Sequence, residues 1–160
     1  MKFTNRVKQG FTLVEILIVV VILGILAAIV IPQFTNASET ARGSSLQTQL
    51  STIRSQLELY QVQHNGDYPT LVQLQASWGV MTSKTEVDGT INVAGDFGPY
   101  LQQPPKNAFE NSSTVGDIGD AAAALGWVYD EDTGTVKAVC PAAKATELGL
   151  TTADVETYVP

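Results

Sequence analysis

Hydrophobic residues are concentrated in one continuous stretch near the amino terminus. Residues 11–32 read FTLVEILIVVVILGILAAIVIP, and Glu15 is the only charged residue among them. A helix of this length spans roughly 33 Å, which is enough to cross a bilayer. An acidic side chain inside such a helix costs about 2.5 to 3.5 kcal/mol on membrane-insertion scales. Glu15 therefore predicts a function that gives this carboxylate a partner.

Beyond residue 32 the hydrophobic positions thin out into a helical pattern. They recur at intervals of four, three, four and three residues, which places one apolar stripe on a polar helix: Leu46, Leu50, Ile53, Leu57 and Tyr60. Asn65-Gly66 is a typical helix end, so the pattern predicts one helix from Phe11 to about His64. Pro32 and Gly43 are poor helix residues, and they mark its least rigid part.

The carboxy-terminal part predicts a small sheet. Residues 126–129 and 135–140 are β-prone runs separated by a glycine-containing turn, the pattern of a hairpin. Four alternating residues of these runs are expected to cover the apolar stripe of the helix: Trp127, Tyr129, Val136 and Ala138. The pattern thus predicts an α+β fold, with a long amino-terminal helix packed on a small antiparallel sheet.

Several shorter segments predict local structure with less regular patterns. Residues 71–78 indicate a short helix capped by Thr70, and residues 90–93 alternate like a strand. Residues 111–120 are polar and contain glycine, which favours an exposed loop. Residues 152–156 favour a short capped helix or a coil that adheres to the domain.

The charge of the chain lies mainly in its carboxy-terminal part. The formal net charge is −7, and residues 65–160 hold thirteen acidic and four basic residues, a balance of −9. Residues 1–10 carry three cations and no acid, so their removal would take the chain from −7 to −10. This acidity argues against nucleic-acid binding and favours solubility, cation binding or basic partners.

No residue pattern predicts catalysis. Cys140 is the single cysteine and excludes an internal disulfide, and its position in a β-prone run predicts a buried thiol. His64 is the single histidine, and its position at a helix end predicts a capping role. We found no cluster of cysteine and histidine with metal-ligand spacing, no glycine-rich phosphate loop and no nucleophile elbow. We therefore expect that the protein is not an enzyme.

The amino terminus resembles the signal of type IV prepilins and type II secretion pseudopilins. A short basic leader ends in Gly10, Phe11 to Glu15 read FTLVE, and the apolar run holds Gly24 and Pro32. The resemblance implies a pilin-like ladle fold. Its expected parts are a leader at 1–10, a membrane and filament-core half-helix at 11–32, an amphipathic spine helix at 33–64 and a globular head at 65–160.

The resemblance also implies roles for individual residues. A prepilin peptidase is expected to cut between Gly10 and Phe11 and to N-methylate Phe11. The new terminal ammonium would lie one helical turn from Glu15, and it could also meet Glu15 of a neighbouring copy. The resemblance gives Glu15 the task of registering subunits in a filament, and it makes Gly24 and Pro32 points of helix flexibility.

The resemblance implies a structural function rather than a catalytic one. We expect a filament subunit, most simply the major pseudopilin of a type II secretion system. The single cysteine, the short head and the turn at Asn65 to Pro69 support this choice. A type IV pilus subunit for adhesion, motility or DNA uptake is the first alternative, and a membrane-tethered binding domain that never polymerises is the second.

The expected surroundings follow from the same resemblance. The chain would cross the bacterial inner membrane once, with its amino terminus in the cytoplasm and its head outside, before entering a periplasmic or surface filament. Its expected partners are copies of itself, membrane lipid, the prepilin peptidase, the assembly platform and its ATPase, and minor pseudopilins.

Acidic residues of the head raise the question of calcium. Oxygen-rich loops bind Ca²⁺, and the resemblance implies a calcium in a carboxy-terminal loop. The candidate ligands are Asp117, Asp120, Asp130, Glu131 and Asp132. Their spacing lacks the alternation of an EF-hand, so a solvated acidic turn is the alternative.

Overall fold

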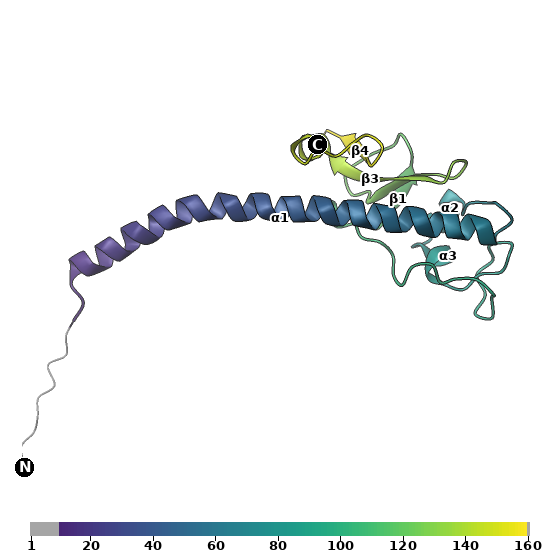
Figure 1. Ribbon diagram of the computed structural model, residues 1–160, viewed down its shortest axis with the longest axis horizontal. Coiled ribbons are helices and arrows are strands. Elements are labelled where there is room, and N and C mark those ends of the chain that lie inside the picture. Colours follow the sequence, from purple (N-terminus) through teal and green to yellow (C-terminus); the bar gives the residue numbers. More distant parts are fainter. Residues whose placement is uncertain (1–9, 160) are drawn as a thin grey trace, which may run out of the picture. The chain divides into compact units, whose positions relative to one another are not determined.

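The computed structural model of the protein describes residues 10–159, apart from the side chain of Asn36, so most of the predicted leader lies outside the described residues. The chain forms two compact units, and the boundary falls between Ser38 and Glu39. The elements in chain order are α1 (Leu13–Gln63), α2 (Leu71–Gln75), α3 (Gly79–Thr82), β1 (Val115–Asp117), β2 (Trp127–Asp130), β3 (Thr135–Pro141), α4 (Ala142–Glu147) and β4 (Val155–Tyr158) (Figure 1).

The first unit contains the apolar part of α1. Every side chain from residue 10 to residue 35 is exposed, and Pro32 lies inside the helix. By length and composition α1 could cross a membrane, and it is the only helix within residues 10–159 of which this is true. The observed helix, Leu13–Gln63, agrees with the predicted span from Phe11 to about His64.

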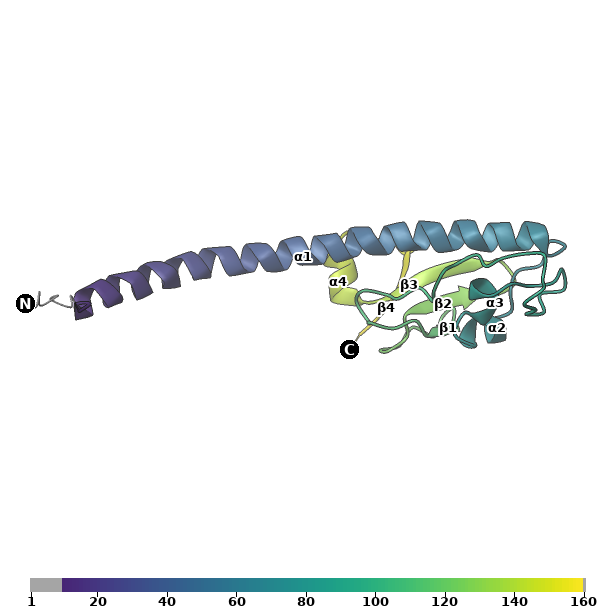
Figure 2. The same ribbon diagram turned by 90° about the horizontal axis from the view of Figure 1, so that it is seen from below.

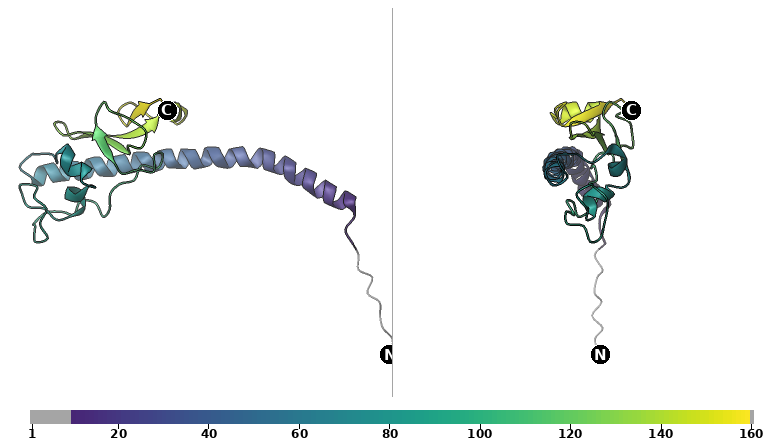
Figure 3. Two further views of the ribbon diagram at one scale, coloured as in Figure 1. Left: turned by 180° about the vertical axis from the view of Figure 1, so that it is seen from behind. Right: turned by 90° about the vertical axis from the view of Figure 1, so that its right-hand side faces the viewer.

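The second unit is built on the remainder of α1. In Figure 2 the sheet and the loops lie on one side of this part of the helix, and in the left view of Figure 3 the green-to-yellow sheet lies above the helix and the teal loops below it. All five stripe residues are buried in one core with Trp127, Tyr129, Val136 and Ala138, as the sequence predicts. Full burial of a large aliphatic side chain stabilises a fold by about 1.5 to 3 kcal/mol, so this stripe is the main attachment of α1 to its unit.

The four strands form one sheet in the order β1-β2-β3-β4. The β2–β3 hairpin is confirmed, with Trp127 opposite Ala138 and Tyr129 opposite Val136. The α+β class is confirmed as well, but the sheet is mixed rather than antiparallel, because β1 is parallel to β2 and β4 is parallel to β3. Parallel pairing needs a crossover connection and leaves no local turn signal in the sequence.

Three local predictions from the sequence were wrong. The predicted loop at 111–120 contains β1, whose Val115 is buried, and the predicted helix or coil at 152–156 contains part of β4. The predicted strand at 90–93 makes only an isolated bridge between Thr85 and Ile91. In each case the local pattern of a short segment could not decide between strand and loop, because cross-strand partners and burial determine β structure.

The predicted end of α1 is confirmed. Asn65 and Gly66 have φ values of 59° and 94°, the left-handed conformation that ends helices, and the Gly66 N–H donates to the Gln61 carbonyl. The following helix α2 begins as predicted at a Thr70 cap, which forms a reciprocal capping box with Gln73. It ends at Gln75, before the predicted limit, and α3 follows as a separate turn.

Arg54 ties the carboxy-terminal segment to α1. Its guanidinium lies 3.0 Å from the Asp154 carboxylate and also donates to the carbonyl oxygens of Val136 and Ala153. One side chain of α1 thus connects this helix to β3 and to the residues just before β4. The Thr151 hydroxyl, and then Arg54, lower the pKa of Asp154 below its usual value.

We expect Leu50→Ala to destabilise the second unit by about 2 to 5 kcal/mol, because it opens a cavity beneath the sheet. Unfolding of the full chain in detergent micelles can be followed by the fluorescence of the buried Trp78 and Trp127. Val62→Ala is the matched control, since Val62 lies on the same helix but is exposed. Equal denaturation midpoints for the two variants would contradict the packing described above.

Candidate functional site

The predicted cleavage site lies just before α1. Gly10 and Phe11 precede the first helical residue, and 84% of the Phe11 side chain is exposed. The bond between them is therefore outside the helix and open to solvent. A peptidase needs an accessible, non-helical segment, and these two residues supply one.

Glu15 occupies the first turn of α1 and is engaged by Thr12. The Glu15 carboxylate accepts hydrogen bonds of 2.8 Å from both the backbone N–H and the hydroxyl of Thr12. The Thr12 hydroxyl in turn accepts the Glu15 N–H at 3.2 Å. Together these bonds form a capping box at the start of α1.

The capping box gives Glu15 a partner within its own chain. Sequence analysis missed this role, although threonine followed three residues later by glutamate before an apolar run is its signature. The box satisfies N–H groups that would otherwise face an apolar environment at the helix end. An incoming cation must therefore compete with Thr12 for the Glu15 carboxylate.

Gly24 and Pro32 both lie inside α1. A side chain at Gly24 would meet no atom within 4 Å, so packing does not require glycine there. Pro32 has no N–H to donate, so the helix lacks one backbone hydrogen bond at that point. The helix continues through both residues, and their role as points of flexibility stays a prediction.

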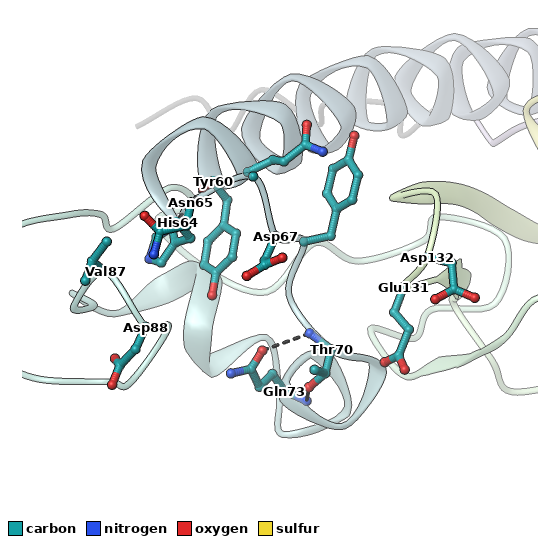
Figure 4. Close-up of a pocket in the computed structure, with 13 residues that line it drawn as sticks. Tyr60, His64, Asn65, Asp67, Thr70, Gln73, Val87, Asp88, Glu131 and Asp132 are labelled. Carbon is teal, nitrogen blue, oxygen red and sulfur yellow. Dashed lines mark hydrogen bonds between the residues drawn. The ribbon is translucent and has the colours of Figure 1, made fainter.

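The second unit contains an acidic cavity of about 650 Å³ at the carboxy-terminal end of α1. Its polar walls come from the end of α1, the turn before α2, the loop around residue 88 and the β2–β3 turn, and they include Tyr60, His64, Asp67, Thr70, Gln73, Asp88, Glu131 and Asp132. In Figure 4 the Asp67 carboxylate lies between Asp88 on one side and Glu131 on the other. Sequence analysis singled out the turn that contains Asp67 but gave this carboxylate no role, and it did not single out the loop of Asp88.

His64 is buried at the edge of this cavity. Its ring stacks on Tyr60 with centroids 3.7 Å apart, and its two nitrogens contact the Tyr60 carbonyl at 2.8 Å and the Thr85 hydroxyl at 3.0 Å. The predicted helix-end position is confirmed, and the contact to the α1 carbonyl fits the capping role. Burial raises the pKa of Tyr60 to about 12, so this phenol stays neutral.

The carboxylates of the head mostly brace local structure. Glu131 accepts the Leu71 N–H at 2.6 Å and so fastens the start of α2. The Thr133 hydroxyl donates to Asp130 at 2.8 Å and lowers the pKa of that carboxyl. Asp117 accepts the N–H of the next residue, Ile118, at 2.8 Å. These contacts stabilise turns.

The five candidate calcium ligands do not gather at one place. Glu131 and Asp132 line the acidic cavity, whereas Asp117, Asp120 and Asp130 do not. Within residues 10–159 no group of three or more histidine, cysteine or acidic side chains has the geometry to hold a metal ion. Calcium binding by these residues stays a prediction.

Comparison with known proteins identifies the amino-terminal signal. Residues 5–31 match the family described as the prokaryotic N-terminal methylation motif. The type II secretion system core protein G of Vibrio cholerae is 40% identical over 116 residues, which cover 72% of this chain and 75% of that protein. The chain belongs to the prepilin family of type IV pilin-like proteins.

Other relatives of this prepilin match a shorter region. The core protein G of Dickeya chrysanthemi is 40% identical over 69 residues, 43% of this chain and 44% of that protein, so the match covers less than half of the relative. The competence protein ComGC of Bacillus subtilis is 35% identical over 69 residues, 43% of this chain and 70% of that protein. No solved structure gives a significant match to the prepilin.

The capping box predicts that Thr12→Val loosens the first turn of α1. Loss of an N-cap hydroxyl costs about 1 kcal/mol, so we expect hydrogen exchange of the Glu15 amide to become about fivefold faster in the full chain in micelles. Thr12→Ser keeps the hydroxyl and serves as the control. Equal exchange rates in the two variants would show that the hydroxyl does not cap the helix.

Cys140 predicts a thiol that reacts only after unfolding. It is buried, and burial raises the pKa of the thiol to about 11 from the usual 9.0. At neutral pH the thiolate is then about a hundredfold scarcer than for an ordinary cysteine. We expect labelling by a thiol reagent to be slow in the folded prepilin and fast in denaturant, and rapid labelling of the folded chain would place Cys140 at the surface.

Proposed function

We propose that this prepilin is the structural subunit of a type IV pilus-like filament, and specifically the major pseudopilin of a type II secretion system. One observation carries the proposal: Glu15 is the single charge in an apolar stretch of 22 residues, and it lies in the first turn of α1 beside the predicted cleavage site. The capping box with Thr12 gives that carboxylate hydrogen bonds but no cation to neutralise it, whereas assembly would supply one.

The proposed assembly step depends on cleavage between Gly10 and Phe11. Hydrolysis of that bond leaves the Phe11 nitrogen as a terminal ammonium, which stays protonated and cationic after N-methylation. This cation then binds the Glu15 carboxylate of a neighbouring copy, where it replaces Thr12 of that copy as the partner of Glu15. The contact joins the ammonium of one copy to the carboxylate of the next, so it is head-to-tail. Such contacts propagate into helical filaments when the rotation between neighbouring copies does not close a ring.

Before assembly, α1 would hold the subunit in the inner membrane with the acidic second unit outside the cytoplasm. The three cations of the leader favour a cytoplasmic amino terminus. The transfer from bilayer to filament keeps the exposed apolar side chains of residues 11–34 away from water throughout. The proposed partners are the prepilin peptidase, the assembly platform with its ATPase, and minor pseudopilins.

The choice of a secretion pseudopilin rests on the extent of similarity. The relative from Vibrio cholerae is named as a type II secretion system core protein, and it aligns with 72% of this chain, which is more than the amino-terminal helix. Cys140 is the single cysteine of the sequence, so the chain has no internal disulfide, and this supports the same choice. We propose a structural role without catalysis, because the Thr85 hydroxyl that contacts His64 is fully buried and so cannot reach a substrate.

A type IV pilus or competence subunit is the second candidate. The observation that favours it is the match to ComGC, whose printed name refers to competence, over 69 residues. Both candidates share cleavage, N-methylation and polymerisation. Long surface fibres would support this candidate, whereas short periplasmic fibres and loss of a secreted protein on deletion would support the pseudopilin.

The assembly proposal predicts that Glu15→Leu is cleaved but does not enter filaments. Cleavage needs the exposed bond before Phe11, whereas polymerisation needs the carboxylate to bind the neighbour's ammonium. The measurement is the mass and amino-terminal sequence of protein in a sheared-fibre fraction and in membranes. We expect at least a tenfold loss from the fibre fraction, the effect of about 1.4 kcal/mol or more per subunit contact.

The control is Glu58→Gln, which removes an exposed carboxylate farther along the same helix. This variant should be processed and should enter fibres as the wild-type chain does. Normal amounts of Glu15→Leu in fibres would refute the role of Glu15. A wild-type chain that keeps residues 1–10 and stays in membranes would instead support a tethered domain that does not polymerise.

A further inference from the structure

The helix α4 lies against α1 just after the boundary between the two units (Figure 2). Gly43 of α1 is buried there, and a Cβ atom added to it would lie 3.3 Å from Cδ1 of Leu148. The absence of a side chain at Gly43 therefore lets Leu148 approach the helix backbone. Glycine therefore has a packing role at position 43, although it lowers the helix propensity of α1.

Lys144 of α4 joins this contact to a charged residue of α1. Its ammonium pairs with the Glu39 carboxylate and, at 3.0 Å, with Glu147. Glu39 is the first residue of the second unit. The hydrogen bond that Lys144 donates to Glu39, and then the one that it donates to Glu147, raise the pKa of Lys144, so the cation persists at any physiological pH.

The two sides of this contact differ in how α1 is supported. From residue 10 to residue 35 all side chains are exposed, and at Pro32 the helix lacks a backbone hydrogen bond. Between residues 37 and 45 only Glu39 and Gly43 are not fully exposed, and the buried stripe begins at Leu46. Among the side chains that the structure describes, the contact with α4 is therefore the first support that α1 receives after Pro32.

We propose that Lys144, together with Leu148 on Gly43, clamps α1 at Glu39 and fixes the position at which local loosening of the helix stops. Without the clamp, helix opening that begins near Pro32 would continue to Leu46. The clamp would therefore keep seven further residues helical, residues 39–45, which span about 10 Å of helix. The clamp is a property of the single chain, so it holds whether or not the proposed filament role is correct.

The clamp predicts faster hydrogen exchange in one short segment when Lys144 is changed. Lys144→Met keeps the aliphatic stem and removes the cation. In the full chain in micelles, amide exchange from Glu39 to Gly43 should become about two- to fivefold faster, the range expected for a partly exposed ion pair. Exchange from Leu46 to Gln63 should not change, because the buried stripe holds that segment.

Lys137→Met is the matched control, because Lys137 lies on β3 next to α4 and has no ion pair among the described residues. Glu39→Gln removes the other end of the clamp and should reproduce the effect of Lys144→Met. The double variant should exchange no faster than either single variant, because both changes break the same pair.

Three results would overturn the clamp. Unchanged exchange from Glu39 to Gly43 in both single variants would show that the ion pair does not hold the helix. Faster exchange spread over Leu46 to Gln63 would show that Lys144 supports the whole unit rather than its boundary. Effects that multiply in the double variant would likewise exclude a shared pair.

Discussion

Contact between the apolar stripe of α1 and one face of the sheet organises the second unit. The stripe supplies a straight row of side chains, and β2 and β3 cover it with aromatic and aliphatic residues that alternate along each strand. The strands are short, and a small sheet is not stable alone in water. The helix and the sheet therefore depend on each other, and the loops, the acidic cavity and the Arg54 network all build on this pairing.

The amino-terminal part of the same helix follows a different rule. From residue 10 to residue 35 its side chains are mostly apolar on every face and all are exposed, so an apolar environment for them must come from outside the chain. Glu15 is tolerated there because Thr12 satisfies it locally at the helix end. One helix thus combines a segment that is completed by its surroundings with a segment that is completed by its own domain.

The periodic patterns in the sequence were sufficient for the long elements. The stripe from Leu46 to Tyr60, the helix end at Gly66 and the β2–β3 hairpin all depend on local spacing, and the structure confirms them. The strands β1 and β4 were missed, because parallel partners far along the chain decide their pairing. Asp67 and Asp88 reach the acidic cavity by loop folding, which no spacing reveals.

The Glu15 site was likewise predicted only in part from the sequence. Its unusual charge was evident from composition, and the threonine three residues earlier was a readable cap signal that sequence analysis overlooked. The contacts of Lys144 and Leu148 with α1 join residues about one hundred positions apart, so only the folded chain shows them.

The lone cysteine has a consequence for how the second unit is held together. Within residues 10–159 no disulfide closes the carboxy-terminal segment, and its attachments include the β3–β4 pairing and the Arg54 bonds. Many small secreted domains depend on thiol oxidation for their stability. With Cys140 as the single cysteine of the sequence, this unit forms no internal disulfide, so its fold does not depend on one.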